Sequence, residues 1–146
     1  MVIHKLTARF GCLEGDTLEL HEGLNVINAP NESGKSTWCA FIRAMLYGID
    51  SAERAKKGSL PDKTRFAPWT GSPMSGTMEI SHGGREITLA RSTKAANAPM
   101  RVFSATYTGS ADAVPGLDGS NVGEYLTGAS REVFCSSAFI GQGAAA

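Results

Sequence analysis

The chain lacks an excess of charge of either sign. Its 14 lysine and arginine residues balance 14 aspartate and glutamate residues, so the formal net charge is zero. A neutral chain produces no overall field that would draw it to nucleic acid or to a membrane surface. Any role on DNA must therefore come from a local basic patch or from a partner.

Cysteine is scarce, and its pattern argues against two common uses. Cys12, Cys39 and Cys135 are widely spaced, form no C-x-x-C pair and have no histidine cluster nearby. This spacing does not fit a disulfide framework or a zinc site. The sequence instead predicts reduced thiols and a cytoplasmic location. Cys39 falls within an apolar helical stretch, where we expect it to be packed.

Long hydrophobic runs are absent as well. No stretch approaches the roughly 20 apolar residues of a transmembrane helix, and His4, Lys5 and Arg9 interrupt the first apolar stretch, so no signal peptide is expected. No heptad pattern survives two turns, which excludes a coiled coil within these residues. We expect no membrane contact and a single domain over residues 1–146, a length that suits one hydrophobic core.

The chain does contain a candidate phosphate-binding loop. Residues 29–37 read Ala-Pro-Asn-Glu-Ser-Gly-Lys-Ser-Thr, and match the P-loop pattern G-x-x-x-x-G-K-[ST] except that Ala29 replaces the first glycine. In such a loop, backbone N–H groups surround the β-phosphate, the lysine reaches the β/γ oxygens and the hydroxyl binds Mg²⁺. Alanine is the smallest side chain that still allows the turn, so we expect the geometry to persist.

The flanking residues support this interpretation. Leu24, Val26 and Ile27 predict a short strand before the loop, and residues 38–46 carry apolar side chains at helical spacing until Gly48 supplies a stop signal. A strand, a loop and a helix in this order direct the positive end of the helix dipole at bound phosphates. The alternative is an ordinary strand-to-helix turn with an incidental lysine.

Alternating apolar residues and turn signals predict further strands and two short helices. The expected strands are residues 2–13, 16–20, 24–28, 77–80, 86–90 and 101–107. Gly83-Gly84 marks a hairpin turn between two of them. Helices are expected from 123–126 and after Ser130, a plausible N-cap. The fold class is therefore α/β, with a mixed sheet, one main helix after the phosphate loop and an antiparallel β layer over residues 77–107.

A basic segment follows the main helix. Residues 53–66 hold five cations against two acidic residues. The cations are Arg54, Lys56, Lys57, Lys63 and Arg65. With Phe66 and Trp69 close by, this segment could contact phosphates and stack on bases. A solvated loop is the alternative interpretation.

Several stretches resemble the N-terminal half of SMC-like ABC-type ATPase heads, the family that includes double-strand-break repair ATPases of the SbcC and YhaN kind. These stretches are the opening alternation, the variant loop 29–37, the apolar run ending in Gln142, and the segments 61–63, 67–69 and 131–134. The resemblance covers nearly the whole chain. It implies a P-loop NTPase of ABC/SMC type, with residues 1–146 as the N-terminal lobe of the head.

The resemblance also implies roles for individual residues. The nucleotide-binding residues would be Asn31, Glu32, Ser33, Gly34, Lys35, Ser36 and Thr37. Lys35 would contact the β/γ-phosphates and Ser36 would bind Mg²⁺. Gln142 would match the Q-loop glutamine, which completes the Mg²⁺ shell and positions the attacking water. Lys35 and Gln142 are thus the candidate catalytic residues, and Ser36 and Gln142 the candidate metal ligands. Arg9 is a further candidate nucleotide contact, with an exposed strand cation as the alternative.

Family members carry a coiled coil, a signature motif, an acidic Walker B strand and a switch histidine after that glutamine, and none occurs in residues 1–146. Because phosphoryl transfer depends on positioning and electrostatic stabilisation, we expect weak binding of Mg-ATP or ADP without hydrolysis by this chain alone. The implied partners are the C-terminal half of the head and a second head, which ATP would join as a dimer, together with a nuclease subunit and DNA in repair or chromosome maintenance.

Two other functions stay open. A self-contained small P-loop NTPase or kinase would need its own metal carboxylate, for which Asp50, Asp62 and Asp112 are candidates only by default. A DNA-contacting module without nucleotide turnover would use the cations of residues 53–66 and Trp69.

Overall fold

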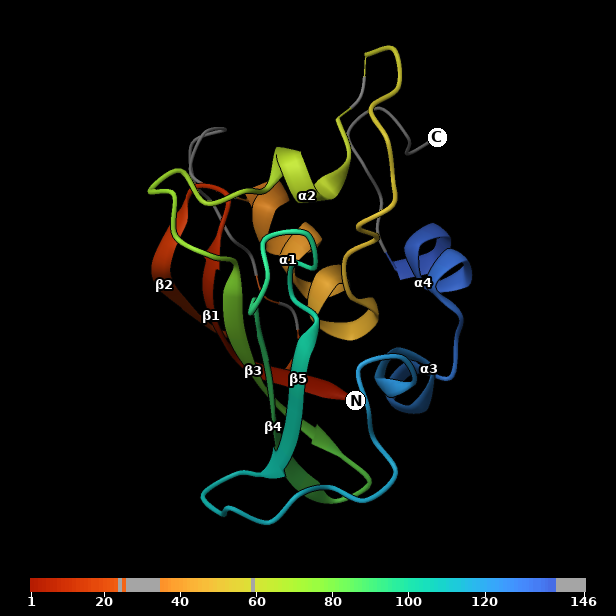
Figure 1. Ribbon diagram of the computed structural model, residues 1–146. Helices are drawn as coiled ribbons and strands as arrows, with labels where there is room; N and C mark the ends of the chain where they lie inside the picture. Colours follow the sequence, from red (N-terminus) through yellow and green to blue (C-terminus); the bar gives the residue numbers. More distant parts are fainter. Residues whose placement is uncertain (24, 26–34, 59, 139–146) are drawn as a thin grey trace.

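The computed structural model describes residues 1–23, 25, 35–58 and 60–138. In chain order the described elements are β1 (Val2–Phe10), β2 (Leu13–Glu19), α1 (Lys35–Tyr47), α2 (Asp62–Arg65), β3 (Ser75–His82), β4 (Arg85–Ser92), β5 (Val102–Tyr107), α3 (Val122–Thr127) and α4 (Arg131–Ala138). They form two layers, with the strands on one side and α1, α3 and α4 on the other (Figure 1). None of the described helices combines the length and apolar character needed to cross a bilayer.

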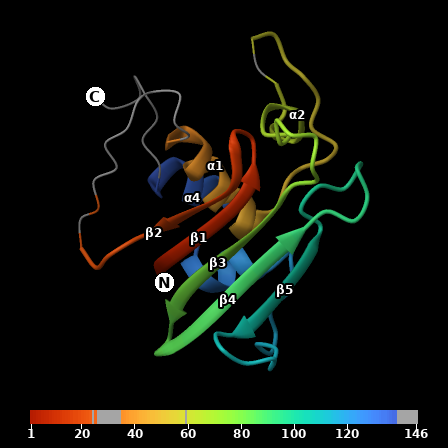
Figure 2. The same ribbon diagram turned by 90° about the vertical axis from the view of Figure 1, so that its left-hand side faces the viewer.

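The described strands form one five-stranded sheet in the order β2-β1-β3-β4-β5 (Figure 2). Every neighbouring pair is antiparallel. The β3–β4 hairpin turns at Gly83 and Gly84, whose φ angles of 59° and 77° are the left-handed values that a tight hairpin turn requires. The expected hairpin and the strand over 101–107 are confirmed, as are the two antiparallel strands near the N-terminus.

The sheet differs in one respect from the expected mixed sheet. Its described strands are antiparallel throughout, because β1–β2, β3–β4 and β4–β5 are consecutive strands and β1 runs antiparallel to β3. The expected antiparallel layer over residues 77–107 is thus part of one sheet with the N-terminal strands. The expected strand at residues 24–28 lies outside the described residues except for Asn25.

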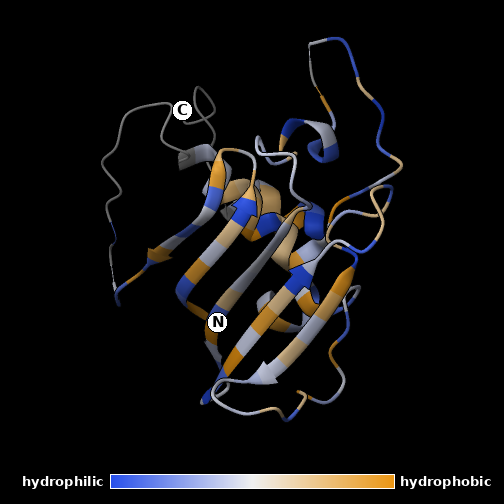
Figure 3. Cartoon of the chain, turned by 60° about the vertical axis from the view of Figure 1, so that its left-hand side comes forward, coloured by the Kyte–Doolittle hydropathy of each residue, from blue (hydrophilic) through white to orange (hydrophobic). Residues whose placement is uncertain are grey.

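Apolar and polar residues alternate along the strands (Figure 3), and this alternation gives the sheet one buried face and one open face. Leu6, Ala8 and Phe10 of β1 are buried, as are Met78 and Ile80 of β3. The residues between them form a polar open face. One row of Cα partners crosses all five strands on this face: Thr17, Thr7, Thr77, Ala90 and Ser104.

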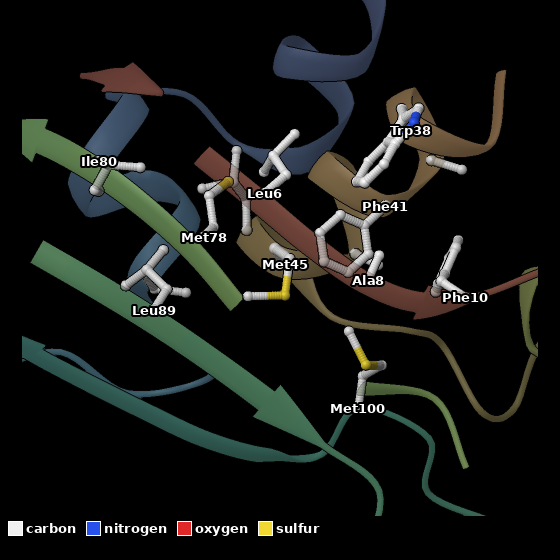
Figure 4. Packing of buried hydrophobic residues seen from close by; sticks show 14 of the residues in the cluster. Leu6, Ala8, Phe10, Trp38, Phe41, Met45, Met78, Ile80, Leu89 and Met100 are labelled. Carbon is white, nitrogen blue, oxygen red and sulfur yellow. The ribbon is translucent and has the colours of Figure 1, made fainter. Parts of the chain in front are cut away.

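Helix α1 fills the buried face. Trp38, Phe41 and Met45 point from the helix toward the apolar side chains of β1, β3 and β4 (Figure 4). The rings of Phe10 and Phe41 meet edge to face, with centroids 5.6 Å apart. Gly48, with φ of 78°, follows the helix, and its N–H donates to Ala44 O at 2.8 Å. The predicted helix and its glycine stop are confirmed.

Cys39 is a correction to the sequence analysis. We expected it to be packed in the apolar helix, but it is exposed. Helical periodicity explains the difference: Trp38, Phe41 and Met45 turn toward the sheet, whereas Cys39 lies three residues after the exposed Ser36 on the other side of α1.

The short helices were predicted unevenly. Helices α3 and α4 confirm the two expected near the C-terminus, and Ser130 Oγ accepts a hydrogen bond from Val133 N at 3.3 Å, as an N-cap does. Helix α2 falls in a segment expected to be a loop. Its N-terminus carries Pro61, whose carbonyl accepts from Thr64 N and Arg65 N, followed by Asp62 in the first turn. This Pro-Asp opening was the available signal.

Candidate nucleotide-binding site

The N-terminus of α1 is the centre of the candidate site. The described part of α1 starts at Lys35, and residues 29–34 precede it in the sequence. The side chain of Ser36 is exposed and that of Thr37 is half-buried. No acidic residue lies in the first turn. The described end of the helix therefore keeps its N-terminal charge uncompensated by its own side chains, which favours an anion there.

The turn between β1 and β2 supports this end of α1. Cys12 Sγ lies 3.7 Å from Thr37 Oγ1. A methyl group at Gly11 would lie 3.2 Å from Thr37 Cγ2, so the turn and the helix are already in close contact. Gly11 N donates to Phe66 O at 2.8 Å, and Trp69 N donates to Gly11 O at 3.1 Å. These two bonds join the turn to the segment after α2. Because the turn also contacts Thr37, it supports the first described turn of α1.

Aromatic side chains pack between the first described turns of α1 and the sheet. Phe10 stacks on Phe66 with centroids 5.0 Å apart and meets Phe41 edge to face. Trp38 in turn meets Phe41 with centroids 5.9 Å apart. The first turns of α1 thus rest on a rigid apolar base, and rigid support is what a phosphate-binding helix end needs for fixed N–H directions.

Several residues of the candidate site lie outside the described part of the chain. These are Asn31, Glu32, Ser33, Gly34 and Gln142, together with the side chain of Lys35. Of the sequence-predicted residues, the structure brings Ser36 and Thr37 together at the helix start. The contacts of Lys35 and Gln142 with nucleotide or Mg²⁺ stay predictions.

Arg9 points away from α1. Its neighbours Ala8 and Phe10 are buried toward the helix, whereas Arg9 is exposed on the open face of the sheet. The guanidinium lies over Gly15 of β2, where an added methyl group would be 3.7 Å from one of its nitrogens. The structure therefore places Arg9 as an exposed cation on the face of the sheet opposite α1, and its contact with nucleotide stays a prediction.

Of the three candidate metal carboxylates, Asp50 and Asp62 line a common hollow, and Asp112 is not among its lining residues. Asp62 pairs with Arg43, Oδ2 to Nη2, at 2.8 Å. Asp50 Oδ1 accepts from Ala52 N at 2.9 Å. Asp112 lies beyond β5, where Ser110 Oγ accepts from its backbone N–H. Over the described ranges, no group of three or more His, Cys, Asp or Glu side chains is placed to hold a metal ion.

The basic segment contains one correction. Phe66, which we expected to be available for base stacking, is buried against Phe10. Its ring completes the apolar base under α1 and cannot also face a nucleobase. Trp69 is 75% exposed and keeps its ring available. Arg65 lies over the outer side of the Phe66 ring, 5.1 Å from its centroid.

A hollow lined mainly by apolar atoms lies beside α2. Its volume is about 430 Å³, and it lies between residues 63–74 and the loop after β4, with Lys63 and Lys94 among its lining residues. Residues 63–74 and 93–101 contain no aspartate or glutamate. Lys63 Nζ donates to Ser51 O at 2.7 Å, which fixes its direction. This end of the molecule is locally cationic although the whole chain is neutral.

Comparison with known proteins gives one family match. The model of a family described as AAA domain matches residues 1–137. No curated protein matches the chain.

Proposed function

Because the chain belongs to the AAA domain family, we propose that residues 29–37 bind the phosphates of Mg-ATP or Mg-ADP at the start of α1. The family assignment supports an ATPase-type nucleotide-binding domain. The single observation that carries the proposal is that Lys35, Ser36 and Thr37 lie in the first described turn of α1, because a P-loop places its lysine and hydroxyl residues in the first turn of the helix that follows it.

The proposed roles follow from this placement. Ser36, exposed in the first turn, binds Mg²⁺ through its hydroxyl, and Thr37 holds the turn against Cys12. Lys35 neutralises the β/γ-phosphates. Gln142 completes the Mg²⁺ shell and orients a water molecule in the assembled head. ATP supplies the phosphoryl group and Mg²⁺ neutralises its charge.

A finer proposal concerns the assembly. We propose that residues 1–146 act as the N-terminal lobe of an SMC-like ATPase head in the cytoplasm. The C-terminal half of the head supplies the acidic strand, and a second head closes over the nucleotide. A nuclease subunit and DNA are the proposed partners of that assembly. Because no group of three or more His, Cys, Asp or Glu side chains among the described residues is placed to hold a metal ion, the proposal assigns the acidic strand to another polypeptide segment.

Calorimetric titration with Mg-ADP tests the proposal. Lys35→Ala should weaken binding by at least tenfold, since a charge-assisted contact to phosphate is worth more than about 1.4 kcal/mol. Lys57→Ala removes an exposed cation from the basic segment and serves as the matched control. Equal affinities for wild type and Lys35→Ala would contradict the proposal.

The alternative of a self-contained NTPase or kinase predicts a different result, because such an enzyme would hydrolyse ATP without another polypeptide. Such an enzyme would release phosphate steadily as the purified chain, and Lys35→Ala would abolish that release. Asp62 is a poor metal ligand for it because Arg43 already holds its carboxylate at 2.8 Å. We expect no phosphate release above the Lys35→Ala background.

A second candidate, contact with nucleic acid, is favoured by one observation. The fully acid-free segments 63–74 and 93–101 face a common hollow beside the exposed Trp69. Cations with an exposed ring suit a single strand, through phosphate contacts and base stacking. Fluorescence anisotropy with a labelled single-stranded oligonucleotide should show binding that weakens steeply with salt and is reduced by Trp69→Ala. No binding at low salt would remove this candidate.

A further inference from the structure

Arg91 is a buried cation on the core side of the sheet. It lies on β4 in the apolar register of Ile87 and Leu89, and only 4% of it is exposed. Burial lowers the pKa of its guanidinium to about 10. A buried charge is costly unless it is paired and hydrogen-bonded.

Backbone carbonyls from three separate segments accept from this guanidinium. Nε donates to Met45 O at 2.8 Å, Nη1 to Met100 O at 3.2 Å and Nη2 to Gly119 O at 2.9 Å. The ring of Phe103 lies 5.0 Å below the guanidinium carbon. Met45 belongs to the last turns of α1, so Arg91 joins the C-terminal end of this helix to the loops before β5 and α3.

These partners leave the positive charge without a counterion. Within the described parts of the chain, no carboxylate forms an ion pair with Arg91. A guanidinium has five N–H groups, and the three carbonyl bonds use three of them. Asp118, the carboxylate beside Gly119, accepts instead from Ser120 N, Ser120 Oγ and Asn121 N. One N–H group on Nη1 and one on Nη2 therefore have no acceptor among the described residues, and the positive charge has no counterion there.

The guanidinium opens into a hollow of about 380 Å³. Its lining residues include Gly48, Arg91, Met100, Arg101 and Gly119. The lining thus contains a second arginine, Arg101, and it contains no acidic residue. Gly48 and Gly119 approach the guanidinium so closely that a methyl group on either would lie 3.5 or 3.3 Å from Nη1. Glycine at both positions keeps the charge accessible from the hollow.

We propose that this hollow is an anion-binding site, in which Arg91 and Arg101 hold a small oxyanion such as inorganic phosphate or a carboxylate. In this proposal Arg91 donates the remaining N–H groups of Nη1 and Nη2, and charge-assisted bonds of this kind suit both anions. Exposed Arg101 supplies the second charge from the rim. The site lies at the C-terminal end of α1 and is separate from the phosphate loop at the other end of that helix.

The test uses Lys35→Ala protein, so that phosphate binding at the P-loop does not contribute. Inorganic phosphate and malonate are titrated in separate arms at constant ionic strength, and backbone amide shifts are followed by NMR. We expect saturable shifts centred on Gly48, Met100 and Gly119. The arm that binds more tightly identifies the preferred anion.

Two variants decide whether the arginines are responsible. Arg101→Gln should weaken binding about tenfold, since it removes one charged donor from an exposed position without disturbing the core. Arg85→Gln is the control, because Arg85 is an exposed arginine at the other end of β4 and packs on Tyr107. Arg91→Lys keeps the charge but loses the paired donors, and should reduce binding further in a protein whose folding is checked by circular dichroism.

Two results would overturn the proposal. One is the absence of saturable shifts around the hollow with either anion. The other is an unchanged affinity in Arg101→Gln, which would show that Arg101 takes no part in holding the anion and that the proposed two-arginine site is wrong. If Arg91→Lys does not fold, the comparison of Arg101→Gln with Arg85→Gln still decides between these outcomes.

Discussion

Phe41 of α1 occupies the space that a side chain at Gly76 of β3 would need. A methyl group at Gly76 would lie 2.2 Å from Cζ of Phe41 and 2.8 Å from the Thr7 carbonyl oxygen. The missing side chain at this strand position therefore lets the helix approach the sheet. It fixes the depth at which α1 packs on the sheet.

Gly76→Ala should destabilise the protein. We expect a loss of about 1–3 kcal/mol in the free energy of unfolding, because overpacking forces Phe41 and the strand apart. Urea denaturation measures the change. Ser75→Ala, at the neighbouring position on the opposite face of β3, should cost less than about 0.5 kcal/mol. Similar stabilities for both variants would mean that α1 shifts without cost.

Tyr47→Phe should loosen the contact between α1 and α3. Tyr47 Oη contacts Thr127 Oγ1 at 2.8 Å and donates to Ala129 O at 2.9 Å. Loss of these bonds should cost about 1 kcal/mol, measured as a lower denaturation midpoint. Tyr125→Phe removes the same hydroxyl from an exposed ring and should leave the midpoint unchanged. The reverse ranking would contradict the assigned role of Tyr47.

Asp118 should make the loop before α3 sensitive to acid. Hydrogen bonds from the Ser120 side chain, the Ser120 backbone and the Asn121 backbone lower the pKa of its carboxyl group. Since the folded-state pKa is depressed, the stabilisation is present above the unfolded value of about 3.9 and is lost as the pH falls through the folded value. Asp118→Asn should flatten this acid limb in denaturation curves measured from about pH 5 down to pH 2. An unchanged slope would show that these bonds do not persist in solution.

Cys39 should be the fastest thiol to react with Ellman's reagent. It is exposed on α1, whereas Cys12 and Cys135 are half-buried. Exposure governs access of the reagent to the thiolate. Cys39→Ser should remove the fastest phase, and Cys12→Ser should leave it in place. A fast phase that survives Cys39→Ser would contradict the assigned orientation of the helix.

Local pattern predicted most elements of the fold. The alternation around Gly83-Gly84 identified the β3–β4 hairpin, and the helical spacing of Trp38, Phe41 and Met45 identified α1 with its stop at Gly48. These features depend on residues close together in the chain, so the spacing of apolar residues in the sequence is enough to predict them. The single antiparallel sheet was harder to predict from the sequence, because the pairing of β1 with β3 depends on contacts between segments that are distant in the chain.

The environments of single residues were harder to predict. Phe66 was expected to face a ligand and is instead stacked on Phe10, since an aromatic ring in a basic segment gives no sign of which neighbour buries it. Arg91 was overlooked, although its position two residues after Leu89 placed it in the buried register of the strand. A charged residue in an apolar register was the available signal.

The strand order has a kinetic consequence. Thr7 of β1 pairs with Thr77 of β3, and the intervening chain, including all of α1, must close into a large loop before these two strands meet. The β3–β4–β5 meander closes through the Gly83-Gly84 turn and the loop of residues 93–101, both far shorter than the β1–β3 connection, and can form early. We expect refolding to be limited by the arrival of β1, so that α1 gains its support only in the slowest step.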